Sequence, residues 1–199
     1  MPVETLAKPS AAHEHLRQDP TMADLVAQHG YLAIEPAADP FRRLVRSIGR
    51  QQVSMAAARA TWERLTDRFE VTPAEMLAAE PAALQDAGLS EAKSEYVRAV
   101  AAAFAEDGWS RSAFTDQSDE AVIEQVTEVR GIGPWTAKMF LLFGLGREDV
   151  FPVEDLGVRQ AMETLYDVET RTEMRERAGS WAPYRSVAAL YLWRHAEST

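Results

Sequence analysis

Hydrophobic side chains recur along much of this chain at intervals of three or four residues, the period of a helix that buries one face. One regular stripe predicts a helix from about residue 54 to 69, with its apolar side chains in the core. The stripe consists of Ala58, Trp62, Leu65 and Phe69. No segment shows the strict alternation of apolar and polar residues that is typical of a half-buried strand. The pattern therefore predicts an all-α fold.

Helix-capping residues set the expected boundaries of the other helices. We expect Ser10 and Thr21 to begin two short helices, the second of which ends at Gly30. Asp39 followed by Pro40 is typical of a helix N-terminus, so another helix is expected up to residue 48. Another helix is expected to begin near residue 73. Further helices are expected over residues of about 81–87, 90–106, 119–129, 134–145, 155–166 and 183–194.

The composition fits a folded protein of ordinary type. The chain has 199 residues, of which 46% are hydrophobic and 26% are charged, enough for one domain or two closely packed subdomains. No run approaches the roughly 18–20 apolar residues that cross a bilayer, and the N-terminus lacks the pattern of a signal peptide. We therefore expect a cytoplasmic protein that does not bind membranes.

The absence of cysteine removes several kinds of chemistry. It excludes disulfides, thiolate zinc sites, a catalytic cysteine and a cysteine-ligated iron–sulfur cluster. The four histidines show no spacing typical of a metal motif. The sequence thus predicts no catalytic metal or other required cofactor.

The charge is unevenly distributed. The formal net charge of −10 argues against a general attraction to nucleic acid. Residues 41–69, however, contain seven arginines and two acids, a local net charge of about +5. Most of these arginines are expected on solvated helix faces. A local contact of this segment with an anionic partner is therefore compatible with the negative net charge.

The most specific motif joins two predicted helices at Arg130-Gly131-Ile132-Gly133-Pro134. Glycine at both positions permits positive φ and a close approach of the backbone, and proline favours the start of the second helix. Free backbone N–H groups at such a helix N-terminus suit a phosphate, so the hairpin is predicted to bind the DNA backbone without distinguishing the bases. A plain helical hairpin with a glycine turn is the alternative.

Several segments together resemble the helix-hairpin-helix DNA glycosylases, most closely the compact 3-methyladenine DNA glycosylases of the AlkA/Mag type. The matching segments are Gly131–Ala137, Asp149–Gly157, Gln51–Ser54, Gly88–Ser90 with Lys93, Trp181–Ser186 and Tyr191–Trp193. The resemblance implies two helical subdomains with a cleft between them. Residues 40–147 would form one, with the hairpin and a wedge loop; residues 1–39 and 148–199 would form the other.

The resemblance implies that Asp155 is the catalytic residue. Cleavage of an N-glycosidic bond places positive charge on the sugar, as in glycoside hydrolysis, and a carboxylate can stabilise this charge and orient a water molecule. Asp155 also suits the N-cap of the following helix and could pair with Arg159. Its neighbour Glu154 is expected to point elsewhere.

A second implication is that the reaction stops at hydrolysis. Related enzymes that also cut the strand use a lysine nucleophile at the position where this chain has Trp135, and Lys138 lies one turn further along. A monofunctional glycosylase that leaves an abasic site is therefore expected.

The base must leave the stack and enter a pocket. Alkylated purines are cationic in the nucleoside, so an aromatic pocket could bind them by stacking and cation–π attraction. The resemblance places Trp135 and Trp193 in this pocket, with Met139, Tyr191 and Gln51 beside it. Core packing is the alternative for each of these side chains.

The resemblance also implies how the DNA is held. Gln52, with Val53, is the candidate wedge that fills the gap left by the base. The phosphates of the DNA backbone are expected to contact Gly131, Gly133, Thr136, Lys138 and Arg50. A structural Na⁺ or K⁺ could bind the hairpin through the backbone carbonyls of Thr127, Val129 and Ile132.

The sequence therefore favours a monomeric glycosylase that acts on double-stranded DNA containing alkylated purines. Its substrates would include 3-methyladenine. The sequence leaves open whether 7-methylguanine, hypoxanthine and ethenoadenine are also substrates. The second hypothesis is a DNA-binding helix-hairpin-helix module without catalytic activity. The third hypothesis is a bifunctional glycosylase/lyase.

Overall fold

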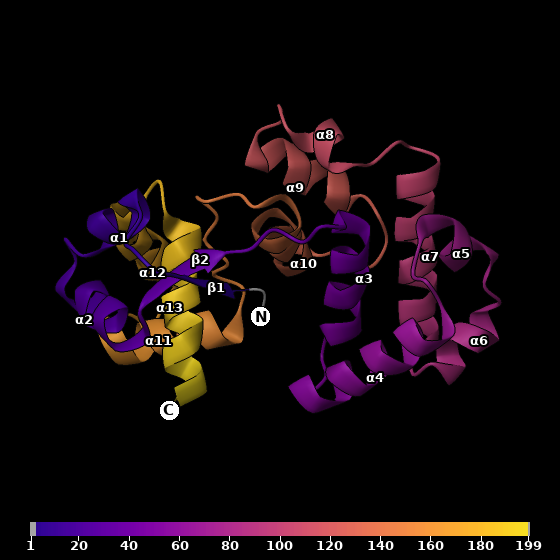
Figure 1. Ribbon diagram of the computed structural model, residues 1–199, viewed down its shortest axis with the longest axis horizontal. Helices are drawn as coiled ribbons and strands as arrows, with labels where there is room; N and C mark the ends of the chain where they lie inside the picture. The colour runs from indigo at the N-terminus through magenta and orange to yellow at the C-terminus, as the bar shows by residue number, and fades with distance from the viewer. Residues whose placement is uncertain (1–2, 199) are drawn as a thin grey trace. The chain divides into compact units, whose positions relative to one another are not determined.

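The computed structural model describes residues 3–198 (Figure 1). These residues form two compact units. The inserted unit is Ala37–Leu145, and the terminal unit combines the segment up to Pro36 with the segment from Gly146 onward. Helices dominate both units, which confirms the predicted all-α class. The roles predicted for the two subdomains stay a prediction.

The inserted unit consists of helices joined by short turns. They are α3 (Pro40–Arg50), α4 (Met55–Arg68), α5 (Pro73–Ala78), α6 (Pro81–Asp86), α7 (Glu91–Ala105), α8 (Arg111–Phe114), α9 (Asp119–Thr127), α10 (Pro134–Phe140) and the π-helix η1 (Leu141–Leu145). The carboxylate of Asp39 accepts the N–H of Arg42 at 3.1 Å, and the hydroxyl of Ser90 accepts that of Lys93 at 3.2 Å. These bonds satisfy N–H groups of the first helical turn, so both helices begin where the caps predict.

A chain of edge-to-face aromatic rings forms the centre of the inserted unit. Neighbouring ring centroids lie 5.3 to 5.7 Å apart, the spacing at which such pairs are favourable. The rings belong to Phe41, Phe104, Trp109, Phe114 and Phe140. Helix α7 packs against α3, α5 and α6 beside this core (Figure 1).

The terminal unit adds a small sheet to its helices. Its elements are β1 (Val3–Leu6), α1 (Ala11–Leu16), α2 (Pro20–His29), β2 (Tyr31–Ile34), α11 (Leu156–Tyr166), α12 (Arg171–Ala178), the 3₁₀ helix η2 (Gly179–Trp181) and α13 (Arg185–Ser198). The two strands are antiparallel, with Leu6 opposite Tyr31. Helix α13 packs against α11, α2 and β2, so the last helix joins both segments of this unit.

A buried carboxylate organises the core of the terminal unit. Asp19 caps α2 and accepts hydrogen bonds from the indole N–H of Trp181 at 2.8 Å and the hydroxyl of Tyr166 at 3.0 Å. It also forms an ion pair with Arg177. Because the carboxylate has several donors, its burial is compensated.

Three expectations about the elements are wrong. The strands β1 and β2 were not predicted because each has only four residues and shows no strict alternation. The N-cap of α2 is Asp19, not Thr21, because Pro20 occupies the first helical position and Asp19 accepts the N–H of Thr21. The short helices α8 and α12 were not expected.

The predicted stripe of α4 is only partly buried. Ala58 and Leu65 lie in the core, whereas Trp62 and Phe69 are half-buried. The guanidinium groups of Arg42 and Arg46 each lie 5.6 Å from the ring of Trp62. Two arginine side chains therefore contribute to the cover of this half-buried indole. Among the described residues, no helix is both long and apolar enough to cross a membrane.

Candidate functional site

The hairpin between α9 and α10 contains two glycines in different conformations. Gly131 has φ +92°, and a Cβ there would lie 2.0 Å from the ring of Tyr96. Gly133 has φ −93° and is the N-cap of α10. A Cβ on Gly133 would meet no atom within 4 Å. Gly131 therefore uses the positive φ that glycine permits, whereas Gly133 has an ordinary φ and open surroundings that leave the helix N-terminus accessible.

Helix α7 supports the turn of this hairpin. The ring of Tyr96 occupies the space that a side chain at position 131 would need. Arg130 forms an ion pair with Glu95 at 2.8 Å, and its guanidinium lies 6.0 Å from the ring of Tyr96. These contacts fix the turn from the side of α7.

The first turns of α10 carry four of the predicted site residues. Trp135 and Lys138 are half-buried, and Met139 is buried in the inserted unit. Thr136 is also buried, and its hydroxyl accepts a hydrogen bond from the amide of Gln51 at 3.0 Å. The hydroxyl of Thr136 is therefore engaged within the protein. The expected contact of residue 136 with the DNA backbone stays a prediction.

The α3–α4 loop, residues 51–54, is attached to the hairpin through Gln51. Its amide nitrogen donates to the carbonyl oxygen of Gly131 at 2.9 Å and to the hydroxyl of Thr136 at 3.0 Å. Both contacts lie within the inserted unit. The structure thus gives Gln51 a role in joining two predicted DNA-binding segments, and its predicted place beside the base pocket stays a prediction.

The remainder of this loop is exposed. Gln52 has φ +54°, a left-handed conformation that costs a non-glycine residue about 1–3 kcal/mol. Its side chain is exposed, and 46% of Val53 is accessible to solvent. Arg50 lies at the end of α3 with its guanidinium 3.1 Å from the sulfur of Met55. The predicted wedge residues therefore project from a strained and well-supported turn.

Asp155 and Trp193 are brought together in the terminal unit. The Oδ1 atom of Asp155 accepts the indole N–H of Trp193 at 2.8 Å and the backbone N–H of Val158 at 3.1 Å. Asp155 is half-buried at the N-terminus of α11, and Trp193 is 7% exposed on α13. A Cβ on Gly157 would lie 3.3 Å from both side chains. The carboxylate is therefore held in one orientation by a helix end and an indole.

The neighbouring acid is directed to another partner. Glu154 lies 3.8 Å from the guanidinium of Arg175 on α12. Two adjacent carboxylates thus differ in setting, since one caps a helix beside a tryptophan and the other faces an arginine.

Tyr191 has a structural position. It is fully buried, and its hydroxyl donates to the carbonyl of Gly30 at 2.8 Å and accepts the N–H of Leu32 at 3.1 Å. A side chain with no exposed surface cannot contact a ligand directly. The predicted place of Tyr191 in the base pocket is therefore corrected to an anchor for β2.

The carbonyls proposed for a cation lie at the end of α9 and in the turn. Thr127 is the last residue of α9, where helix carbonyls lack intrahelical donors. The carbonyl of Val129 accepts the N–H of Ile132 at 3.1 Å. Within residues 3–198, no three His, Asp or Glu side chains are grouped so that they could hold a metal ion.

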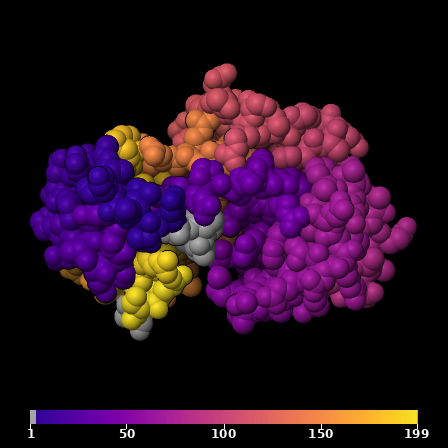
Figure 2. All heavy atoms as spheres, in the orientation of Figure 1, coloured from indigo at the N-terminus to yellow at the C-terminus, as the bar shows by residue number. Residues whose placement is uncertain are grey.

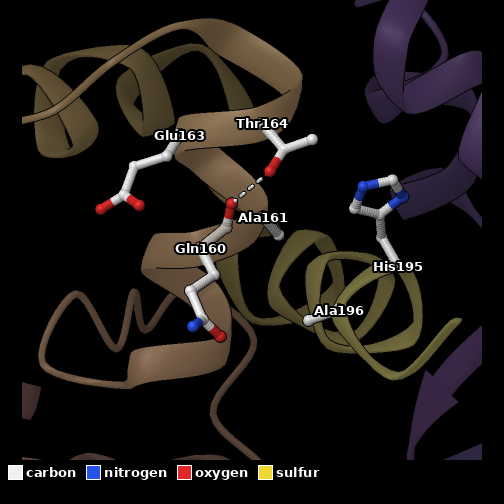
Figure 3. A pocket seen from close by; sticks show the side chains of 6 residues that line it. All are labelled: Gln160, Ala161, Glu163, Thr164, His195 and Ala196. Carbon is white, nitrogen blue, oxygen red and sulfur yellow. Dashed lines mark hydrogen bonds between the residues drawn. The ribbon is translucent and has the colours of Figure 1, made fainter. Parts of the chain in front are cut away.

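A cavity of about 330 Å³ lies between α11 and α13, and none of the residues that line it is a predicted site residue. Figure 3 shows His195 on one side of it and Thr164 on the other. Thr164 donates to the carbonyl of Gln160 at 2.9 Å, and the lining combines these residues with Ala161, Glu163 and Ala196. This cavity contains no arrangement of groups that resembles a catalytic site.

Two important contacts were not predicted. The bond from Trp193 to Asp155 joins residues 38 positions apart, and Lys93 binds the carbonyl oxygens of Gly49 and Gln51. Lys93 belongs to one of the segments that carry the family resemblance, which was the available signal. Its partners could not be predicted because main-chain carbonyls have no sequence signature.

The chain is similar to known DNA repair proteins. Residues 45–184 match the family described as HhH-GPD superfamily base excision DNA repair protein. DNA-3-methyladenine glycosylase 1 of Schizosaccharomyces pombe is 30% identical over 165 residues, which are 78% of this chain and 72% of that protein. A Bacillus subtilis relative is 38% identical over 117 residues, 57% of this chain and 41% of its own length.

A solved structure has nearly the same extent. The 3-methyladenine DNA glycosylase Mag1 of S. pombe, in complex with abasic DNA, superimposes with a TM-score of 0.84 at 28% identity. The match covers 94% of this chain and 97% of that one.

Proposed function

Because the chain belongs to the HhH-GPD superfamily of base excision DNA repair proteins, we propose that it is a DNA glycosylase specific for alkylated purines such as 3-methyladenine. The observation that carries the proposal is the carboxylate of Asp155, held by Val158 and Trp193 beside the N-terminus of α11. The enzyme hydrolyses the N-glycosidic bond in double-stranded DNA and leaves an abasic site.

Asp155 acts on the charge that develops during bond cleavage. As the base departs, positive charge accumulates on the sugar. A fixed carboxylate stabilises this charge without having to reorient, which is the main advantage of a preorganised site. The indole N–H of Trp193 keeps the carboxylate in place, so Trp193 is a positioning residue as well as a candidate for the wall of the pocket.

The base reaches the site by leaving the helix stack. Gln52 and Val53 enter the gap from the exposed α3–α4 loop. The half-buried ring of Trp135 stacks on the base, and a cationic alkylated purine is attracted to its π face. The selectivity for damaged bases then comes from both the weaker pairing of the lesion and its charge.

The hairpin binds the DNA backbone near the lesion. The open surroundings of Gly133 let a phosphate approach the N–H groups at the start of α10. Lys138 and Arg50 add cationic side chains from the same unit. Contacts of this kind are local, so they are compatible with a net charge of −10.

The enzyme is monofunctional. Strand cleavage by related enzymes requires a lysine that forms a Schiff base with the sugar, and Trp135 stands at the matching position. Treatment with borohydride in the presence of damaged DNA therefore traps no covalent complex. A trapped complex that disappears in Lys138→Ala would instead identify a bifunctional enzyme.

A bound K⁺ or Na⁺ at the hairpin is a separate part of the proposal. Carbonyl oxygens of Thr127, Val129 and Ile132 are suitable donors for such an ion, and the end of α9 supplies carbonyls that lack helical partners. The ion would help to hold a phosphate at the hairpin. Replacing K⁺ with tetramethylammonium at constant ionic strength should weaken DNA binding, and unchanged affinity would remove the ion from the proposal.

The decisive experiment measures base release from methylated duplex DNA by the wild type and Asp155→Asn. Asparagine is as good a helix N-cap as aspartate and can still accept the N–H of Trp193. We therefore expect a stable variant that binds DNA normally but releases 3-methyladenine more slowly by about 100-fold or more.

Glu154→Gln is the matched control, because it removes the adjacent charge that faces Arg175. It should retain base release within about threefold, since its carboxylate has a different partner. If the wild type binds DNA but releases no methylated, deaminated or etheno base, the non-catalytic module is the correct assignment.

A further inference from the structure

Lys93 binds the end of helix α3. Its ammonium group donates to the carbonyl oxygen of Gly49 at 2.9 Å and to that of Gln51 at 2.8 Å. These carbonyls lie at the C-terminus of α3, where the last oxygens lack helical donors and the helix dipole is negative. Partial burial removes part of the hydration of the Lys93 ammonium group and so lowers its pKa from the ordinary value.

Gln51 connects the same loop to the hairpin. While its carbonyl binds Lys93, its side chain donates to Gly131 and Thr136 at 2.9 and 3.0 Å. One residue is thus held through its backbone by α7 and through its side chain by the hairpin turn. Helix α7 also contacts the turn directly, because the ring of Tyr96 packs on Gly131. Lys93 and Tyr96 are three residues apart and share one face of α7.

The contacts of Gln51 with α7 and with the hairpin hold the residues that follow it in the α3–α4 loop. Gln52 is in the left-handed region at φ +54°. Val53 is 46% and Met55 59% exposed, and both belong to the few large hydrophobic side chains described as exposed. A residue in this strained conformation persists only if the neighbouring structure holds it firmly.

We propose that Lys93 is a positioning residue for base flipping, which holds the α3–α4 loop and the hairpin as one rigid element. Binding of the hairpin to the DNA backbone then places Gln52 and Val53 at the base stack without a separate ordering step. This inference rests on the proposed glycosylase function, since it assigns the loop a part in the same reaction.

Lys93→Met tests the inference, and Arg98→Met is the matched control. Arg98 lies on the same helix and donates to the carbonyls of Leu77 at 2.7 Å and Ala79 at 2.6 Å at the end of α5. Each variant removes a cation that α7 places on the end of a neighbouring helix. Both should therefore lower the melting temperature to a similar extent, whereas only Lys93→Met disturbs the wedge loop.

The readouts separate binding, flipping and chemistry. Fluorescence of 2-aminopurine beside a lesion reports extrusion of the base, titration with abasic duplex reports binding, and single-turnover release reports excision. For Lys93→Met we expect binding within about threefold of wild type, with extrusion and single-turnover release lowered by about 10- to 100-fold. Lys93→Arg keeps the charge and the donors and should restore much of both.

Two results would overturn the inference. One is normal extrusion and release by Lys93→Met in a wild type that excises bases. The other is an equal loss in Arg98→Met, which would show that general destabilisation is the cause. If the wild type itself excises no base, the proposed function fails, and the extrusion signal still decides whether Lys93 positions the loop.

Discussion

A buried imidazole links the first helix of the chain to the sheet. The Nδ1 atom of His13 accepts the backbone N–H of Ser10 at 2.9 Å, and Nε2 lies 2.9 Å from the carbonyl oxygen of Leu32. Because a carbonyl only accepts, Nε2 carries the proton and the ring is neutral. Burial is the main cause of a lowered pKa for His13.

This arrangement predicts a pH dependence of stability. In the unfolded chain His13 takes up a proton near its ordinary pKa of 6.5, whereas in the folded protein it does so only at lower pH. The unfolded state then binds more protons, so the free energy of unfolding falls as the pH decreases from above 6.5 to the folded pKa. Urea unfolding of the wild type and His13→Gln at several pH values measures this contribution.

The carboxylates titrate in both proteins, so the difference between the two curves isolates His13. We expect this difference to shrink as the pH falls below 6.5. A difference that is constant from pH 8 to pH 5 would mean that the imidazole does not change its protonation between the folded and unfolded states.

At the scale of elements, the two glycines of the hairpin are required for different reasons. Gly131 is fixed by the protein itself, through its positive φ and the ring of Tyr96. Gly133 has an ordinary φ and open space around it. Nothing within the protein requires glycine there, which agrees with a ligand that approaches the backbone closely.

The pair of alanine variants separates these reasons. Gly131→Ala should lower the free energy of unfolding by about 2 kcal/mol or more, because Cβ clashes with Tyr96. Gly133→Ala should cost less than about 1 kcal/mol yet weaken binding to abasic duplex by about tenfold, because a methyl group enters the phosphate site. Thermal unfolding and fluorescence titration provide both values, and normal DNA binding by a folded Gly133→Ala would contradict the assignment.

The same elements show what the sequence could predict. Helices marked by local signals, such as Asp39-Pro40, Ser90 and Gly133-Pro134, begin where expected. Strands β1 and β2 are not predicted because each is short and gains its stability from a partner 25 to 31 residues away.

The candidate site also combines features that the sequence predicts with contacts that it does not predict. Asp155 and the glycine hairpin are local motifs that could be recognised in the sequence. The bonds from Trp193 to Asp155 and from Lys93 to Gln51 depend on helix packing between distant segments. For the same reason the sequence predicts a pocket position for Tyr191, although packing buries this side chain against β2.

For the molecule as a whole, the charge distribution matters more than the net charge. The segment of α3 and α4 is exposed over a wide area of the face seen in Figure 2. On α3, Arg42, Arg46 and Arg50 are four residues apart and follow one helix face towards the α3–α4 loop. Stacking of Arg42 and Arg46 on Trp62 restricts their motion, so this face offers preordered cations on the helix that leads to the proposed wedge loop.

Salt dependence can test whether this face contacts DNA. If Arg46 neutralises one phosphate, Arg46→Ala should reduce the slope of log K against log salt concentration by about 1. Arg171→Ala, an exposed arginine of the terminal unit, should leave the slope unchanged. Equal slopes for all three proteins would restrict the backbone contacts to the hairpin and Arg50.

The terminal unit is discontinuous in the sequence, and this imposes an order on its assembly during synthesis. Strand β2 leaves the ribosome well before α13, yet the hydroxyl that secures the strand belongs to Tyr191 on that helix. At about 5–20 residues per second, the strand waits on the order of ten seconds or more for this partner. Meanwhile the inserted unit is complete in the growing chain once Leu145 has emerged. The inserted unit, to which the proposed function assigns DNA binding, is therefore translated in full before the indole that binds Asp155. Under that proposal, a nascent chain would be able to bind DNA before it could cleave a glycosidic bond.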